Sequence, residues 1–187
     1  MVSSPAELTI ECHNSQGMRR LKNELLAVYE EVYVERLNNP FFTPERFWGR
    51  LEGYASRDGF RLVTARLGSE LIGFTLGETL PEGSGWWRGF KGDINPELLN
   101  ETGKRTFAIN ELMVRPAWRR RRYAKRLSAA LLEGRTEERA TLLVRAENTP
   151  AYTAYLSWGF KVLGQVKPFE DSPTYEAMVR ELDGATG

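Results

Sequence analysis

The sequence of 187 residues contains one cysteine and one histidine. A single thiol, Cys12, excludes an internal disulfide framework and any CxxC redox or zinc site. A single imidazole, His13, excludes a His-rich metal site and leaves a Ser-His-Asp triad without support. We therefore expect no bound metal. Any chemistry should come from carboxylates, hydroxyl groups, Lys or Arg side chains, or a bound cofactor.

Long apolar runs are also missing, and none approaches the ~18 residues of a membrane span. The opening MVSSPAEL lacks the charged and apolar parts of a signal peptide. Charge of one sign does not dominate, because the sequence contains 26 Lys and Arg residues and 25 Asp and Glu residues. This balance argues against a protein that coats nucleic acid or an anionic membrane. We expect a soluble, cytoplasmic protein without nucleic-acid or membrane partners.

The length fits roughly one domain, and hydrophobic periodicity predicts a mixed α/β organisation over 1–187. Alternating or continuous apolar residues predict strands over 8–12, 60–67, 70–77, 106–114, 140–144, 161–166 and 175–181. Helical spacing and cap residues predict helices over 15–37, from 43 to about 58, over 123–133 and over 148–158.

Segment 78–105 is rich in glycine and predicts a long irregular insertion with one helical turn at 96–99. It carries the aromatic residues Trp86, Trp87 and Phe90, which argue against disorder. Two interpretations of these rings stay open. They pack into the core, or they form a lid over an acceptor site.

A strongly basic stretch follows the predicted strand over 106–114. Residues 115–126 include seven Lys or Arg and no acid, and a helix is predicted to begin within them. A helix N-terminus and guanidinium groups both suit phosphate. The stretch is no Walker loop, because GKS or GKT is missing, and no dinucleotide fingerprint, because the turn lacks glycine. It predicts a polyphosphate site, with a solvated helix face or a nucleic-acid patch as alternatives.

Two motifs resemble the GNAT superfamily of N-acetyltransferases. Residues 112–124, LMVRPAWRRRRYA, are similar to its acyl-CoA pyrophosphate loop. Asn148, Ala151, Tyr155, Gly159 and Phe160 match its second signature, N-x-x-A-x-x-x-Y-x-x-x-G-F, at every position. The resemblance spans about residues 8–181, with the insertion unmatched. It implies a mixed, mostly antiparallel sheet of about seven strands flanked by about four helices.

The resemblance also implies roles for individual residues. Main-chain groups of the strand before the loop would bind the pantetheine arm of acetyl-CoA; these residues are Leu112, Met113 and Val114. The loop would surround the pyrophosphate through its N–H groups and cations; its residues are Arg119, Arg120, Arg121, Arg122, Tyr123 and Ala124. Asn148 would contact the pantetheine, and Tyr155 would protonate the departing thiolate. A core aromatic is the alternative role of Tyr155.

The implied reaction transfers an acetyl group directly to a primary amine, without a metal. An alkyl ammonium near pKa ~10.4 must first lose its proton, which costs about 4–5 kcal/mol at pH 7. A carboxylate can act as the base. Glu111 is the first candidate because it lies on the strand that should flank the thioester, and a structural role is its alternative. Glu78 and Glu147 are further candidates for the base.

One position departs from the family pattern, because Arg122 replaces the usual glycine of the loop. Arginine fits there if its backbone φ is negative and its side chain points outward or onto phosphate. The alternative is a catalytically weak or inactive acyl-CoA-binding or regulatory module on the same fold. The sequence leaves open the acceptor, a small-molecule or peptide amine, and also a homodimer.

Overall fold

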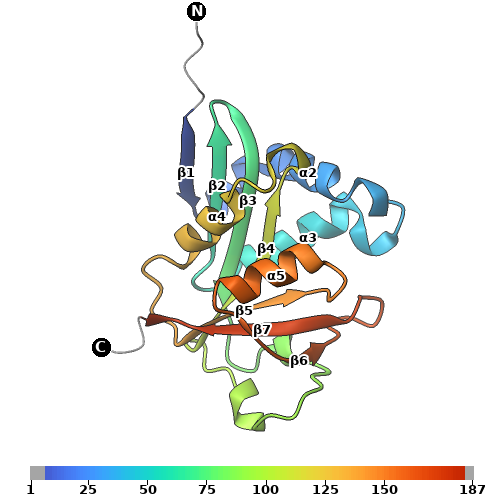
Figure 1. Ribbon diagram of the computed structural model, residues 1–187, viewed down its shortest axis with the longest axis vertical. Coiled ribbons are helices and arrows are strands. Elements are labelled where there is room, and N and C mark those ends of the chain that lie inside the picture. The colour runs from blue at the N-terminus through green and yellow to red at the C-terminus, as the bar shows by residue number, and fades with distance from the viewer. Residues whose placement is uncertain (1–6, 184–187) are drawn as a thin grey trace, which may run out of the picture. The chain divides into compact units, whose positions relative to one another are not determined.

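The structure is a computed structural model that describes residues 7–183. The described part leaves out residues 1–6 and 184–187. The domain predicted over 1–187 includes both of these ends, and the N-terminal segment MVSSPAEL includes the first. The described residues form five α-helices and seven strands (Figure 1). In chain order they are β1 (Leu8–His13), α1 (Ser15–Arg20), α2 (Lys22–Val32), α3 (Pro44–Ala55), β2 (Arg61–Leu67), β3 (Glu70–Thr79), β4 (Thr106–Val114), α4 (Tyr123–Leu132), β5 (Arg139–Val144), α5 (Thr149–Ser157), β6 (Lys161–Val166) and β7 (Tyr175–Glu181).

The seven strands form one sheet in the order β1-β2-β3-β4-β5-β7-β6. β4 pairs with β5 in parallel, whereas the pairs β1–β2, β2–β3, β5–β7 and β6–β7 are antiparallel. The predicted mixed, mostly antiparallel sheet of seven strands is therefore confirmed. Four of the predicted strands differ by a few residues at one end, and those over 106–114, 161–166 and 175–181 agree at both ends.

The chain divides into two compact units. The first unit comprises Met1–Ser56, Phe60–Gly77 and Glu111–Glu133, and the second comprises Arg57–Gly59, Glu78–Asn110 and Gly134–Gly187. β3 and β4 have residues in both units.

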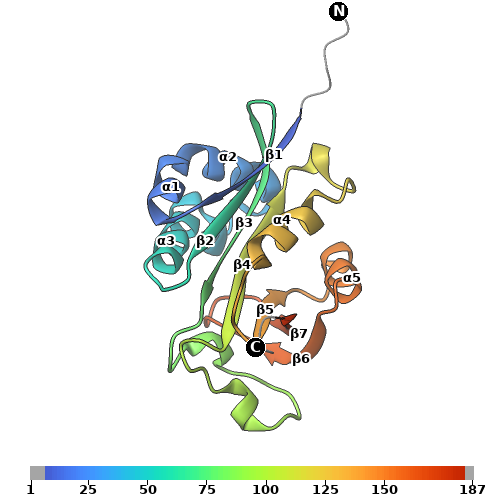
Figure 2. The same ribbon diagram turned by 90° about the vertical axis from the view of Figure 1, so that its left-hand side faces the viewer.

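In the first unit, α1, α2 and α3 cover one face of β2 and β3, and α4 covers the other face (Figure 2). The Tyr29 and Phe47 rings stack with centroids 3.8 Å apart, and the Tyr29 hydroxyl donates to the Phe42 carbonyl at 3.0 Å. Burial of each such large apolar side chain contributes about 1.5–3 kcal/mol. The core of this unit includes Met18, Leu25, Val28, Leu51, Leu62, Phe74 and Leu76.

The prediction of one helix over 15–37 is wrong, because the chain departs from α-helix at Leu21, where φ is −92° and ψ is 8°. The Leu21 N–H donates to the carbonyls of both Gly17 and Met18, at 3.3 and 3.1 Å. The N–H of Leu21 thus stays bonded although this residue departs from α-helix, as in a single 3₁₀ turn. The apolar periodicity therefore continues on both sides of the break. α2 ends at Val32, and 3₁₀ turns follow at Val34–Arg36 and Pro40–Phe42.

In the second unit, the insertion over 78–105 packs against β6 and β7. Trp87 is buried with Val166 and Ala177, and Phe90 and Trp86 pack against this cluster. The interpretation of these aromatics as packing residues is confirmed. The predicted helical turn is the 3₁₀ turn Pro96–Leu99.

Two polar contacts hold the insertion in place. The Glu101 carboxylate is almost fully buried and accepts from Trp87 Nε1, Thr106 Oγ1 and Arg139 Nη2 at 2.8, 2.9 and 3.0 Å. Lys91 and Gln165 exchange two backbone hydrogen bonds of 2.8 Å each. The insertion is therefore an ordered part of this unit.

Candidate active site

The residues predicted to form the site are divided between the two units. Glu111, the three residues that follow it and the arginine-rich loop belong to the first unit, whereas Asn148 and Tyr155 belong to the second. Each group has its own local geometry.

Glu111 lies on β4 in the first unit and is half-buried. Its main-chain oxygen accepts a hydrogen bond of 2.8 Å from Thr75 Oγ1 on β3, which fixes this part of the strand. Burial raises the pKa of the Glu111 carboxyl to about 7, and the positive charge of Arg50 lowers it in part. A carboxyl group with a pKa near 7 is suited to accept a proton at neutral pH.

Arg50 on α3 was not among the residues that the sequence singles out. Its Nη1 donates to the Phe41 carbonyl at 3.2 Å, and its guanidinium stacks over the rings of Phe41 and Phe47 at 5.1 and 5.7 Å. These contacts hold in place a positive charge that favours the ionised form of Glu111. No sequence signal could have found Arg50, because α3 and β4 are brought together only by the fold.

The strand end after Glu111 is anchored by two arginines. The Arg115 N–H donates to the Ile72 carbonyl at 2.8 Å, and its side chain pairs with Glu31 and donates to the Leu71 carbonyl. The guanidinium of Arg119 donates from Nε to the carbonyl of Val114 at 3.1 Å. Arg115 therefore joins β4 to β3 and α2, and its charge is already paired.

The backbone of the arginine-rich loop, residues 119–122, is unusual. Arg120 and Arg122 both have φ of +63°, and Arg122, with ψ of 12°, is the left-handed residue that precedes α4. The negative φ that was the condition for arginine to fit at this position is therefore not met at Arg122. Left-handed backbone costs a non-glycine residue about 1–2 kcal/mol. Arg122 thus keeps the conformation that glycine adopts easily, and such turns can direct successive N–H groups toward an anion.

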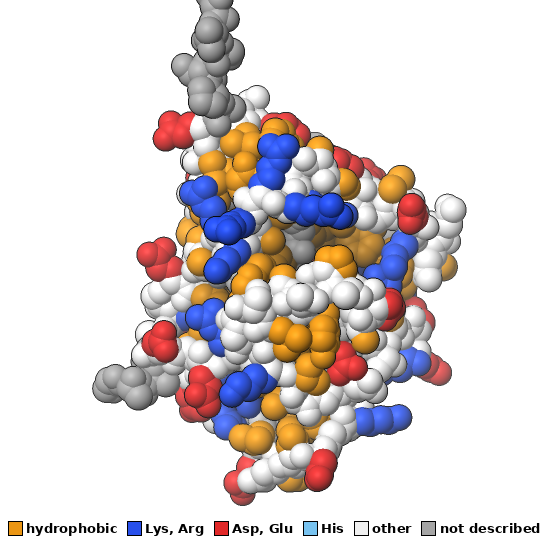
Figure 3. Space-filling view, viewed as in Figure 1, with side chains coloured by type: hydrophobic (Ala, Val, Ile, Leu, Met, Phe, Trp, Pro, Cys, Tyr) orange, Lys and Arg blue, Asp and Glu red, His pale blue; other side chains and the backbone are white. Residues whose placement is uncertain are grey.

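The side chains of this loop leave a concentration of positive charge. Arg121 stacks over the Trp118 ring at 5.0 Å, and Trp118 Nε1 donates to Glu70 at 3.2 Å. The first turn of α4 contains no acidic residue. Figure 3 shows Lys and Arg side chains gathered over α4 and the preceding loop. The exposed cations that form no ion pair within residues 7–183 include Arg120, Arg122, Lys125 and Arg126.

In the second unit, α5 holds the residues of the second motif. Tyr155 is half-buried, and its ring makes edge contacts with Trp158 and Phe160, with centroids 5.4 and 6.1 Å away. The helix ends at Ser157, and Gly159, two residues further on, has φ of +90°. Asn148 precedes the helix as predicted, but its side chain forms no capping hydrogen bond. The Asn148 amide is exposed and does not cap the helix N-terminus.

The two other carboxylates considered as bases differ from Glu111. Glu147 is exposed, and its Oε1 lies 3.6 Å from Arg145 Nη1. Glu78 is fully buried in the second unit and bonds to Arg57.

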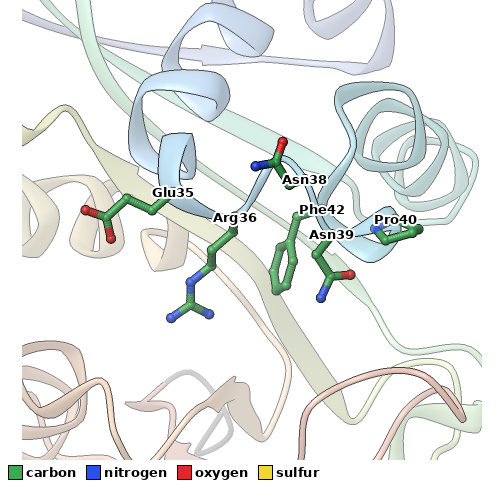
Figure 4. A pocket seen from close by; sticks show the side chains of 6 residues that line it. All are labelled: Glu35, Arg36, Asn38, Asn39, Pro40 and Phe42. Atoms are coloured by element: carbon green, nitrogen blue, oxygen red, sulfur yellow. The ribbon is translucent and has the colours of Figure 1, made fainter.

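A pocket of about 560 Å³ lies along the segment that joins α2 to α3 in the first unit (Figure 4). Arg36, Asn39 and Phe42 point to the same side of this segment in Figure 4. The pocket is lined by Glu35, Arg36, Asn38, Asn39, Pro40 and Phe42. None of the residues predicted from the two motifs lines it.

Within the described residues, no group of three or more His, Cys, Asp or Glu side chains is arranged to hold a metal ion. No helix in this part of the chain has the length and apolar character needed to cross a bilayer.

The acetyltransferase (GNAT) family matches residues 22–160, well over half of the chain. The chain belongs to this family. It is an acetyltransferase of the GNAT fold, and the motif pair at 112–124 and 148–160 lies within the matched region.

Solved structures share this fold at low sequence identity. PH1933 from Pyrococcus horikoshii is 18% identical with a TM-score of 0.68, over 95% of this chain and 99% of that one. An acetyltransferase from Thermus thermophilus is 17% identical with a TM-score of 0.64, over 96% and 100%. The PaiA N-acetyltransferase from Thermoplasma acidophilum, in complex with coenzyme A, is 15% identical with a TM-score of 0.59, over 94% and 99%. Among proteins of curated function, none matches this sequence.

Proposed function

We propose that this GNAT protein is an acetyl-CoA-dependent N-acetyltransferase that transfers the acetyl group directly to a primary amine of a small molecule or peptide. The observation that carries the proposal is the arginine-rich loop. Its left-handed Arg120 and Arg122 precede α4, and within the described residues these two cations have no acidic partner. Such a loop fits the pyrophosphate of coenzyme A, and the PaiA structure contains coenzyme A on the same fold.

The donor would be held along β4 and the loop. Main-chain groups of Leu112, Met113 and Val114 would hold the pantetheine arm and the thioester. The N–H groups of residues 120–124 would bind the pyrophosphate, with guanidinium groups adding charge-assisted hydrogen bonds. Asn148 would contact the pantetheine through its exposed amide. Bound acetyl-CoA supplies the activated acetyl group.

The protein's own groups would move two protons. The ionised Glu111 carboxylate accepts the proton of the acceptor ammonium, directly or through a water, and this frees the nitrogen lone pair for attack. The Tyr155 hydroxyl donates its proton to the departing thiolate, because a phenol near pKa ~10 and a thiol near ~8.5 are matched closely enough for transfer. As the C–S bond breaks, the nitrogen gives up its second proton to the Tyr155 phenolate, which restores the phenol. The amide and the free thiol then leave without a covalent bond to the protein.

The proposal is tested by calorimetry with acetyl-CoA, followed by turnover on a library of primary amines. We expect binding that weakens as salt rises, and thiol release that requires an amine. Desulfo-CoA and 4′-phosphopantetheine serve as comparison ligands, because the first keeps the pyrophosphate and the second lacks it. Absence of acetyl-CoA binding would contradict the proposal. Binding without any turnover would instead favour an acyl-CoA-binding module.

A further inference from the structure

The pocket on the segment that joins α2 to α3 contains none of the residues of the two motifs. Its volume of about 560 Å³ lies in the range of sites that hold a small molecule or the end of a peptide. Three of its side chains, Arg36, Asn39 and Phe42, point to the same side of the segment (Figure 4). The hydrogen-bonding groups that these side chains leave free determine which ligand suits the pocket.

Phe42 provides a fixed apolar wall. Its side chain is largely buried, and the residue is 8% exposed. The Phe42 ring stacks with that of Tyr33, with centroids 5.4 Å apart, and meets the edge of the Phe41 ring at 5.0 Å. Its carbonyl oxygen accepts from the Tyr29 hydroxyl at 3.0 Å. The ring is therefore held from within the protein, and a ligand that packs against it requires no rearrangement.

Arg36 supplies a positive charge without a partner. Its guanidinium carbon lies 5.7 Å from the centroid of the Phe42 ring, a contact that orients the group without using its N–H donors. Within residues 7–183, the Arg36 side chain has neither a hydrogen bond nor an ion pair. The carboxylate of the neighbouring Glu35 extends in another direction (Figure 4). The N–H groups of this guanidinium are thus free to bind a ligand.

Asn39 adds a second donor group to the same side. Its Oδ1 accepts from the Phe41 N–H at 2.9 Å, which caps the 3₁₀ turn Pro40–Phe42. This hydrogen bond fixes which end of the amide is the oxygen. The Nδ2 group, which can only donate, therefore remains for a ligand.

A guanidinium and an amide N–H group beside an apolar ring match a carboxylate on a hydrocarbon stem. A guanidinium binds a carboxylate through two parallel hydrogen bonds, and the two charges cancel. A phosphate dianion would keep one negative charge uncompensated next to Glu35, so the carboxylate is the better match. A second ammonium group on the ligand would instead meet the positive charge of Arg36.

The pocket is connected to the candidate base within the first unit. Phe41, which adjoins the lining residue Phe42, accepts at its carbonyl from Arg50 Nη1 at 3.2 Å. The positive charge of Arg50 in turn acts on the Glu111 carboxyl and lowers its pKa in part. The pocket and Glu111 belong to the same compact unit. An acceptor anchored at Arg36 would extend along these contacts toward the base.

We propose that Arg36 and the Nδ2 group of Asn39 bind the carboxylate of the acceptor, whose hydrocarbon part packs on Phe42, and that the acceptors are primary amines bearing a carboxylate, such as amino acids. The assignment of the ligand as the acceptor rests on the proposed acetyl transfer, whereas the carboxylate site itself does not. The carboxylate anchors the molecule and takes no part in the bonds that form and break.

Matched acceptors test the substrate class. Each set contains an amino acid, its carboxamide and a diamine of similar length, from glycine through β-alanine and γ-aminobutyrate to longer chains. In the preferred set, kcat/KM should favour the acid over the carboxamide by about tenfold, the value of a hydrogen bond between charged groups. The diamine should be a poor acceptor. Preference for the carboxamides or the diamines would overturn this inference and leave acetyl transfer itself intact.

Variants of Arg36 test the residue that makes this distinction. Arg36→Gln should raise KM for the acids about tenfold with kcat nearly unchanged, and it should leave the carboxamides unaffected. Arg36→Lys restores the charge without the planar fork and should recover part of the loss. Arg20→Gln, which changes an exposed arginine of α1 in the same unit, is the matched control. Equal losses for acids and carboxamides in Arg36→Gln would show a merely structural role and would contradict the inference.

A binding measurement separates this inference from the proposed function. In NMR spectra of the wild-type protein, the Nδ2 resonance of Asn39 should shift when amino acids of the series are added, and it should shift less with their carboxamides. The shift should disappear in Arg36→Gln. This result would support the carboxylate site even if no amine were acetylated, an outcome that would contradict the proposed function alone. If acids and carboxamides shift the resonance equally, or neither shifts it, the carboxylate site is wrong.

Discussion

The guanidinium of Arg119 donates to the carbonyl of Val114 at 3.1 Å and so ties the arginine-rich loop to the end of β4. This contact joins β4, which would hold the thioester, to the loop that would hold the phosphates. It forms within the protein and needs no bound donor. Arg115 fixes the same strand end to β3 and α2. The loop is bonded to β4 at its first residue and continues into α4 at its end. Such a loop can keep two left-handed residues in place without a ligand.

The strained backbone at Arg122 gives the first prediction. Arg122→Gly removes the cost of left-handed backbone but adds glycine entropy, so we expect a gain of up to about 1 kcal/mol in the free energy of unfolding. Arg122→Ala removes the same charge but keeps the strained φ, and it should not be stabilised. Denaturant unfolding of the two variants separates the effect of backbone strain on the free energy of unfolding from the effect of the lost charge.

The same pair of variants separates two roles of Arg122 in donor binding. If the guanidinium binds phosphate, both variants should lose about tenfold in acetyl-CoA affinity, the cost of one exposed charge-assisted hydrogen bond. Tighter binding by Arg122→Gly would instead identify the arginine as an obstacle. Calorimetry at two salt concentrations provides both values.

Glu111 gives a prediction about pH and rate. With the pKa of Glu111 raised to about 7, kcat/KM should rise with pH up to about 7 and then level off as the base becomes ionised. Glu111→Gln should lower kcat roughly 10²-fold or more and remove this inflection. Glu147→Gln, which changes an exposed carboxylate, is the control. An unchanged profile in Glu111→Gln would exclude Glu111 as the base.

Glu111 should also make stability depend on pH. A folded pKa of about 7 lies above the unfolded value, so the stabilisation is present below about pH 4.5 and is lost as pH rises to 7. The shift corresponds to a relative loss on the order of 3 kcal/mol, and Glu111→Gln should lack it. Denaturant unfolding of both proteins between pH 5 and 8, which needs no substrate, checks this difference.

Tyr155 and Tyr152 on α5 are both half-buried and form a matched pair. Tyr155→Phe keeps the ring but removes the proton that the thiolate would receive, so kcat should fall roughly 10²-fold with little change in KM. Tyr152→Phe should keep nearly full activity. Equal turnover by the wild-type protein and Tyr155→Phe would leave Tyr155 with the core role that its contacts to Trp158 and Phe160 also support.

The buried ion pair of the insertion predicts an effect on stability. The side chains of Arg139 and Glu101 are 9% and 1% exposed, so Glu101→Gln leaves a buried positive charge without its partner and should cost about 3 kcal/mol. Glu138→Gln breaks the ion pair with Arg105, in which Glu138 is 62% exposed, and should cost less than ~1 kcal/mol. Similar losses in the two variants would contradict the anchoring role of Glu101.

The sequence was sufficient wherever a local pattern determines local structure. The last two strands agree at both ends because apolar residues and turn residues mark them clearly. α3 begins as predicted, with Pro44 in its first turn and Thr43 Oγ1 accepting from the Arg46 N–H. The family could be inferred from two motifs, each of which is one continuous stretch of sequence.

Features that depend on contacts between distant parts of the chain could not be predicted from the sequence. The break at Leu21 leaves every apolar position in helical spacing, so no pattern marks it. The sign of φ at Arg122 was left open by the sequence, which set only the condition under which arginine would fit, and the backbone is left-handed. Arg50 acts on Glu111 from another helix, and Asn110 meets Glu78 only because the fold brings β3 and β4 together. Such relationships arise from residues distant in sequence.

The two hydrogen bonds between Lys91 and Gln165 have a consequence for anyone who shortens this chain. β6 is the last strand of the sheet, and an open strand edge is a template for pairing with another chain, the first step toward aggregation. The insertion covers part of this edge with its own backbone. Its removal would expose β6 to neighbouring molecules, so solubility depends on a segment that contains neither motif of the family.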